Sequence, residues 1–230
     1  MADFHDAITD DHRAFIAKQP VFFVATAADG ARINLSPKGM DAFRVLGPNR
    51  AAYLDLGGSG NETQAHLAAD GARINLSPKG MDCFRVLGPN RVAYLDLGGS
   101  GNETQAHLIA DGRITVMFCA FDNPALILRL YGRGGFVIAG EPGYDDLAAF
   151  FPRLPGARQI FDIAVDSVQT SCGWGVPRMT LDKERLTLAK YHAQQPPEER
   201  LAKIAERTRS IDGLPVRVQQ VMPAFDPLPL

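Results

Sequence analysis

The stretch 91-RVAYLDLGGSGNETQAHL-108 indicates a strand, a glycine-rich turn and the start of a helix, in that order. Val92–Leu97 is apolar apart from Asp96 and is typical of a strand, and Ser100 or Asn102 can cap the helix that follows. Glycines let backbone N–H groups approach an anion, and a helix N-terminus adds unpaired donors with a partial positive charge. The segment therefore predicts a phosphate site in which Ser100, Asn102 and Thr104 are further donors. The plainer interpretation is a capped helix start.

A second interpretation of the glycine-rich segment is an S-adenosylmethionine site, because Leu95–Gly101 resembles the first motif of class I methyltransferases. Asp122, after the next strand, lies where a ribose partner is needed. That fold requires parallel strands joined by crossovers of a dozen or more residues. Here Ile114–Phe121 is followed by a tight Asp122-Asn-Pro turn and another strand. The methyltransferase is therefore the weaker alternative.

The order of elements along the chain is mostly strand after strand, with short turns between them. The strands expected are Val21–Ala25, Arg73–Ser77, Phe84–Leu87, Val92–Leu97, Ile114–Phe121, Leu126–Tyr131, Phe136–Ile138 and Ile160–Val168. The helices expected are 4–18, 102–110, 145–151, 181–194 and 197–209. The first two strands would form a hairpin, with Arg32 onward as the alternative partner, and a glycine-rich turn would separate 126–131 from 136–138. This order predicts a mainly β (α+β) fold, antiparallel, with peripheral helices.

Residues 29–69 and 70–110 repeat each other without gaps at a spacing of 41. The copies differ only at Ala42/Cys83, Ala51/Val92 and Ala68/Ile109. Repeat arrays need at least three units, so we expect a 189-residue protein (230 minus 41) with a tandem duplication, an engineered insertion or a recording error. The second copy is favoured in the barrel because its three residues bury more apolar surface, although the first keeps the join to the upstream strand. The chain is expected to be one domain over 1–230, with 181–230 as a helical, Pro-rich C-terminal extension.

Composition excludes several classes of protein. The chain has 230 residues, and 46% of them are hydrophobic, as in an ordinary globular protein. Its 24 Lys+Arg against 26 Asp+Glu give a net charge of −2, so its overall charge does not favour binding to a nucleic acid. Three cysteines outside any Cys-x-x-Cys pair, and histidines without ligand spacing, predict neither a disulfide framework nor a metal site. No apolar run reaches the ~18 residues of a membrane span. An acidic, polar start is not a secretory signal, so we expect a cytoplasmic protein.

The strand expected at 73–77 has one polar and one apolar face. Arg73, Asn75 and Ser77 alternate with Ile74 and Leu76. Beside the glycine-rich turn, Arg73 and the nearby Lys79 would neutralise a phosphate. The plainer interpretation is a half-solvated strand.

The segment Gln169–Pro177 holds the single tryptophan of the chain, Trp174, between two glycines. A flat aromatic side chain on a permissive backbone can pack against a planar ring. The plainer interpretation is a turn with a surface or interface tryptophan. No nearby base supports Cys172 as a nucleophile.

Taken together, six segments resemble the pyridoxamine 5'-phosphate oxidase-like flavoproteins, whose fold is an FMN-binding split β-barrel. They are ARINLSPKGMD (72–82), RVAYLDLGGSGNETQAHL (91–108), GRITVMFCAF (112–121), LILRLYGRG (126–134), QTSCGWGVP (169–177) and SIDGLP (210–215). The resemblance implies a homodimer with two FMN molecules at the subunit interface. It assigns to the cofactor Arg73, Asn75, Ser77, Lys79, Asp96, Ser100, Asn102 and Thr104, with Trp174 approaching from the partner subunit.

The C-terminus departs from the true oxidase, which has a basic and histidine motif for the substrate phosphate. Here that region holds two expected helices and Ile211–Pro215. We therefore do not expect vitamin B6 oxidation. The function expected is an FMN-dependent oxidoreductase of unknown small-molecule substrate, with NADH or NADPH as a candidate donor and no catalytic residue singled out. A flavin-binding module without turnover is the alternative from another class.

Overall fold

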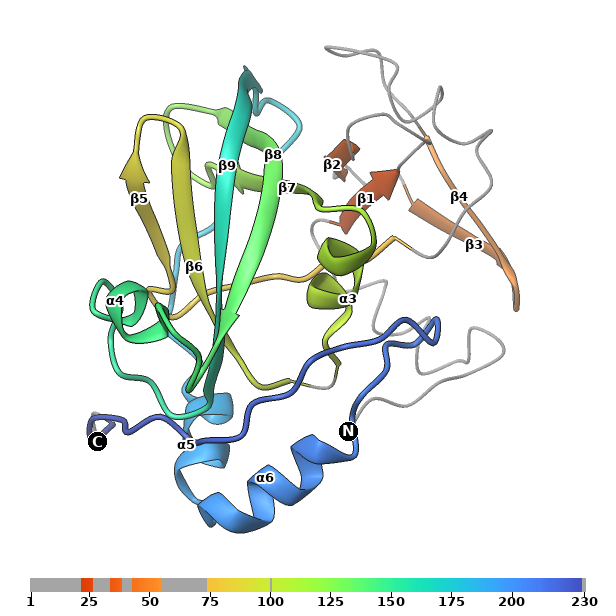
Figure 1. Ribbon diagram of the computed structural model, residues 1–230. Coiled ribbons are helices and arrows are strands. Elements are labelled where there is room, and N and C mark those ends of the chain that lie inside the picture. The colour runs from red at the N-terminus through yellow and green to blue at the C-terminus, as the bar shows by residue number, and fades with distance from the viewer. Residues whose placement is uncertain (1–21, 27–33, 39–42, 55–73, 100, 229–230) are drawn as a thin grey trace. The chain divides into compact units, whose positions relative to one another are not determined.

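The computed structural model describes residues 22–26, 34–38, 43–54, 74–99 and 101–228 (Figure 1). Its strands are β1 Phe22–Thr26, β2 Asn34–Lys38, β3 Phe43–Gly47, β4 Arg50–Tyr53, β5 Phe84–Gly88, β6 Arg91–Leu97, β7 Arg113–Cys119, β8 Leu126–Ile138 and β9 Ala157–Cys172. Its helices are α3 Glu103–Ala110, α4 Tyr144–Ala148, α5 Thr187–Ala193 and α6 Pro197–Ala205. The helix expected at 4–18 lies outside the described residues.

The largest sheet has five strands in the order β5-β6-β9-β8-β7, and two further sheets are the hairpins β1–β2 and β3–β4. β6 pairs antiparallel with both β5 and β9. The predicted fold class is confirmed: the sheets are mainly antiparallel, the helices are few, and the five-stranded sheet is not closed, as in a split barrel. The methyltransferase alternative is wrong, because its glycine-rich motif would follow a strand of a parallel sheet.

β6 is the best-buried strand of the described chain, with six consecutive buried residues. Alternation gives its two faces different neighbours. Ala93, Leu95 and Leu97 belong to the apolar core that also contains Ile160. The other face carries Tyr94, whose ring stacks on Phe161 at 4.8 Å between centroids, and then Asp96. The buried carboxylate of Asp96 thus lies on the same face of β6 as the stacked ring of Tyr94.

The two repeat copies contribute strands to different sheets. β2, from the first copy, pairs with β1 and confirms the alternative hairpin partner. β5 and β6, from the second copy, join the main sheet. The strand expected at 73–77 is wrong for 74–77, which are not in a strand, and Ile74 and Leu76 are exposed. The reason is competition: β1 already pairs with the equivalent segment of the first copy.

The break expected in the glycine-rich part of 126–138 is also wrong, since β8 runs through it without interruption. Gly132 is required there by a close approach and not by a turn. A Cβ built on it would lie 2.1 Å from the backbone oxygen of Ala164 on β9. Only glycine lets the two strand backbones come this close.

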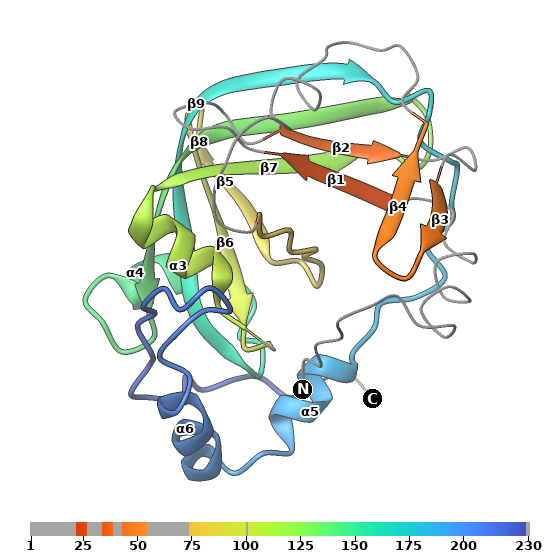
Figure 2. The same cartoon turned by 90° about the vertical axis from the view of Figure 1, so that its right-hand side faces the viewer.

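The chain divides into two compact units. One comprises the described residues up to 74, with 115–130 and 168–180; the other comprises 75–114, 131–167 and the described residues from 181 on. Within the second unit, α5 and α6 lie beyond the end of the sheet at which β6 stops and β9 starts (Figures 1 and 2). No helix of the described chain has the length and apolarity to cross a membrane.

Candidate functional site

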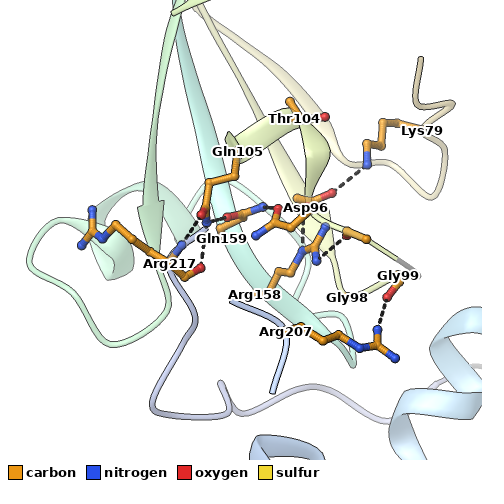
Figure 3. A network of polar contacts seen from close by, with 12 residues as sticks. Lys79, Asp96, Gly98, Gly99, Thr104, Gln105, Arg158, Gln159, Arg207 and Arg217 are labelled. Carbon is orange, nitrogen blue, oxygen red and sulfur yellow. Dashed lines mark hydrogen bonds and ion pairs between the residues drawn. The ribbon is translucent and has the colours of Figure 1, made fainter. Parts of the chain in front are cut away.

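Asp96 is the centre of a polar network in the second unit (Figure 3). Its carboxylate is 1% exposed, and three side chains donate to it. Lys79 Nζ lies 2.7 Å from Oδ1, while Arg158 Nε and Gln159 Nε2 lie 2.6 and 2.8 Å from Oδ2. The strand pairing explains how two consecutive residues reach one acceptor. Asp96 pairs with Gln159 and Leu97 with Ala157, so Arg158 is the extra residue of a β-bulge, which redirects a side chain.

The electrostatics of Asp96 are set by two opposing effects. Burial raises the pKa of its carboxyl group, but the charges of Arg158 and Lys79 and the hydrogen bonds from Lys79 and Gln159 outweigh it. The net effect lowers the pKa below its ordinary value, so Asp96 is ionised at neutral pH. A buried carboxylate with three donors is already satisfied. It positions its partners and would repel a phosphate.

The network continues from Gln159 into α3 and the C-terminal segment. Gln159 Nε2 donates to Asn102 Oδ1 at 2.7 Å, and Gln105 Nε2 donates to Gln159 Oε1 at 2.6 Å. Gln105 also binds the backbone of Arg217 in both directions, at 3.0 and 2.6 Å. These bonds fix the start of α3, whose N-cap Asn102 makes no capping bond with its side chain. The backbone N–H groups in the first turn of α3 therefore have no hydrogen bond to the side chain of Asn102.

The irregular segment before β5 brings two further predicted residues to this network. Asn75 Nδ2 donates to Thr104 Oγ1 at 2.7 Å, and Lys79 reaches Asp96 as described. Thr104 also hydrogen-bonds Tyr94, whose pKa burial raises well above its ordinary value. The structure thus unites Asn75, Lys79 and Thr104 although their segment forms no strand.

The glycine-rich turn after β6 is held by three side chains, one histidine and two arginines, that donate to its carbonyl oxygens. His192 Nε2 lies 2.6 Å from Gly98 O, Arg207 Nη1 lies 3.0 Å from Gly99 O, and Arg158 Nη1 lies 2.9 Å from Gly101 O. Because a trans peptide is planar, its N–H points opposite to its C=O. The N–H groups of Gly99 and Asn102 therefore point away from the side chains of His192 and Arg158.

Arg200 on α6 is a buried cation at the same turn. It is 6% exposed, and its Nη2 has no hydrogen-bond partner among the described residues. A Cβ built on Gly98 would lie 3.1 Å from this atom. Burial lowers the pKa of Arg200, and the charge of Arg158 adds to this effect. A buried charge without a counter-ion costs free energy, so an anion at this point would stabilise the site.

His192 on α5 contributes as a neutral donor. Burial lowers its pKa, and this outweighs the hydrogen bond to Gly98, which raises it. Since a carbonyl oxygen only accepts, Nε2 carries the proton. The buried Nδ1 has no partner in the described part of the chain.

The structure brings together five of the nine predicted site residues: Asn75, Lys79, Asp96, Asn102 and Thr104. Ser77 is exposed, and Trp174, in the other unit, is 84% exposed. Arg73 and Ser100 lie outside the described residues. The sequence argument missed the partners that arrive from later in the chain: Gln105, Arg158, Gln159, His192, Arg200 and Arg207. Of these, Arg200 and Arg207 lie in the helix expected at 197–209, but no local signal placed that helix beside the glycine-rich turn.

Comparison with known proteins gives one informative relative. The chain is 33% identical over 240 residues to a pyridoxamine 5'-phosphate oxidase family protein, ustO, of Aspergillus flavus, covering 94% of this chain and 78% of the relative. Two crystal structures of HupZ from Group A Streptococcus, one a point variant, share 15% and 16% identity, with TM-scores of 0.33 and 0.32. They cover 71% and 74% of this chain and 98% of HupZ, and likeness at this level carries no conclusion. No protein-family model matches the chain.

Proposed function

The chain belongs to the pyridoxamine 5'-phosphate oxidase family, and on this premise we propose that it is an FMN-binding oxidoreductase of unknown substrate. The observation that carries the proposal beyond the family is Arg200, a buried guanidinium without a partner at Nη2, beside the glycine-rich turn. Members of the family commonly bind flavin, and the phosphate of FMN is the anion that such a turn would accept.

The charges at the turn fit a phosphate. Lys79, Arg158, Arg200 and Arg207 are cationic there, while the carboxylates are Asp96 and Glu103, which folds back over Gly101. Asp96 is shared by Lys79 and Arg158. Arg200 Nη2 has no hydrogen-bond partner in the described part of the chain, so its charge is available to an anion. Guanidinium groups suit phosphate because their N–H groups are arranged as a fork.

In this proposal Arg200 and Lys79 supply the positive charge that holds the phosphate. Asp96 keeps Lys79 and Arg158 in place, and His192 and Arg207 fix the turn through its carbonyl oxygens. FMN, when bound, supplies the redox chemistry. We propose a homodimer with Trp174 available to the partner, since an exposed aromatic of this size is typical of interfaces, and NADH or NADPH as electron donor.

The test is to purify the protein, release any cofactor by denaturation and identify it by mass, with absorbance near ~450 nm as the sign of oxidised flavin. Reduction of that flavin by NADH or NADPH would favour an enzyme over a binding module without turnover. A colourless protein that takes up neither FMN nor riboflavin would refute the proposal.

Arg200→Gln then tests the site itself. A hydrogen bond to a charged group contributes roughly 1.5–3 kcal/mol, so FMN affinity should fall about 10- to 150-fold. Riboflavin, which lacks the phosphate, should bind both proteins alike. The apo variant should be at least as stable as the parent, because an unpaired buried charge is gone. Arg185→Gln, at an exposed position of the same extension, is the matched control.

A further inference from the structure

Two buried polar atoms belong to side chains that reach the glycine-rich turn from α5 and α6. Arg200 Nη2 and His192 Nδ1 have no hydrogen-bond partner within the part of the chain that the structure describes. The two residues are only 6% and 7% exposed. Polar groups buried to this extent are hydrogen-bonded in most native structures. A ligand that accepts from both side chains would satisfy this pair.

The imidazole ring of His192 is held in one position by the backbone of two loops. Nε2 donates to Gly98 O at 2.6 Å, just after β6. Just before β9, a Cβ built on Gly156 would lie 2.2 Å from Cδ2 of the ring. The two glycines are joined to each other, because Gly98 N donates to Gly156 O at 2.8 Å. With Nε2 engaged, Nδ1 is the ring nitrogen that remains for a ligand.

Arg200 and His192 come close to the same point of the turn. That point is the position that a Cβ on Gly98 would take, which lies 3.1 Å from Arg200 Nη2 and 3.4 Å from His192 Cε1. Cε1 is the ring carbon between the two nitrogens, so Nδ1 is one bond further on. A phosphate monoester presents three acceptor oxygens. One phosphate can therefore accept from both side chains.

The charges that act on His192 are positive. Burial lowers the pKa of its imidazole most, and the charges of Arg200 on α6 and Arg158 on β9 lower it further, against the hydrogen bond to Gly98. Tyr191, the neighbour on α5, contacts the ring edge-on at 5.3 Å between centroids. The carboxylate of Asp96 already accepts from Arg158. His192 is therefore neutral at pH 7, and an anion bound beside it would favour the charged form.

We propose that His192 is a second ligand of the phosphate and takes up a proton as the phosphate binds. The proposal rests on the proposed function in taking FMN as the source of the phosphate, and inorganic phosphate has the same chemistry. The proton comes from solvent and binds Nδ1, while Nε2 keeps its hydrogen bond to Gly98. A phosphate dianion then meets the two charges of Arg200 and protonated His192, whereas the charge of Lys79 is shared with Asp96. The site would favour a phosphate monoester over a diester, which carries one negative charge.

Nitrogen NMR of the imidazole rings tests the proposal directly. The two ring nitrogens have different chemical shifts in neutral histidine and similar shifts once both are protonated. The protein, with its five histidines isotope-labelled, is titrated with acid alone and with FMN, riboflavin or inorganic phosphate, at equal ionic strength. The signals of His192 are those missing from His192→Gln. Glutamine keeps a donor that can reach Gly98 but cannot take up the proton.

We expect FMN and inorganic phosphate to raise the pKa of His192 by about 1 to 2 pH units, because a hydrogen bond to a charged group contributes this much. Riboflavin, which lacks the phosphate, should leave it unchanged. In a fluorescence titration, His192→Gln should bind FMN about 10-fold more weakly than the parent at about pH 6.5 and nearly as well at about pH 9, where the ring stays neutral.

Two variants separate the phosphate effect from general charge. Arg200→Gln should abolish the response of His192 to phosphate, whereas Lys190→Gln, which removes an exposed positive charge from α5, should preserve it. If FMN does not bind but inorganic phosphate still raises the pKa of His192 in the parent and not in Arg200→Gln, the proton-linked phosphate site stands and the flavin proposal fails. The proposal is overturned if FMN binds without protonating His192, if riboflavin has the same effect, or if neither phosphate compound changes the ring.

Discussion

Asp96→Asn removes the single charge that Lys79 and Arg158 share, at almost constant side-chain size. Breaking a buried ion pair by removing one partner typically costs about 3–5 kcal/mol. Lys79 is about one-third exposed and can turn to water, whereas Arg158 is mostly buried. We therefore expect a loss near the lower limit, about 3 kcal/mol, and a Tm lower by about 6–12 °C for a chain of this length.

The assay is thermal and urea unfolding of Asp96→Asn beside Asp162→Asn. Asp162 pairs with Arg91 at 2.7 Å, but these side chains are 30% and 55% exposed, so the control should lose about 1 kcal/mol or less. The parent should also lose stability in acid where Asp96→Asn does not. A lowered pKa contributes stability above the ordinary carboxyl pKa, and this is lost as pH falls through the folded value. If Asp96→Asn costs no more than Asp162→Asn, Asp96 does not anchor the network.

Two further changes test other parts of the second unit. Gly132→Ala should lower the free energy of unfolding by about 1–3 kcal/mol, because the new Cβ would meet the backbone of Ala164. Gly135→Ala, whose Cβ would have nothing within 4 Å, should be neutral or slightly stabilising. Urea unfolding midpoints compare the two variants, and equal midpoints would refute the close approach. His192→Gln should flatten the pH dependence of stability below about pH 6.5, since a His with a lowered pKa stabilises the fold above its unfolded pKa and less as pH falls through the folded one. Parallel urea-against-pH curves for both proteins would contradict this.

The parts of the fold that the sequence predicted are those set by neighbouring residues. The β5–β6 hairpin follows from its short turn, which acts within a few residues. α3 was expected at 102–110 and is Glu103–Ala110, although Asn102 makes no capping bond with its side chain. The strand expected at 73–77 is wrong for 74–77 because the same sequence occurs earlier and already pairs with β1. No local pattern says which of two identical segments a distant strand will take.

In the candidate site too, the sequence predicted residues of the local segment and missed those that arrive from distant parts of the chain. Asp96 and Thr104 were predicted from the segment that carries them, although Asp96 proved to be an anchor for cations. Arg158 could not be predicted, because a β-bulge depends on how two strands some 60 residues apart are aligned. Arg200 reaches the turn from a helix about 100 residues later, and only the packing of α6 shows that it arrives without a partner.

β3–β4 and β5–β6 pair in the same register, and this likeness bears on the order in which the chain folds. Each hairpin closes across a two-residue turn, a step of microseconds, whereas pairing with β9 must bring together segments far apart in the sequence. Both hairpins can therefore exist before β9 arrives, and neither has a kinetic advantage in forming. If β9 first meets β3–β4, that pairing must be released before the chain reaches the arrangement described. We therefore expect a slow refolding phase that a chain with one copy lacks.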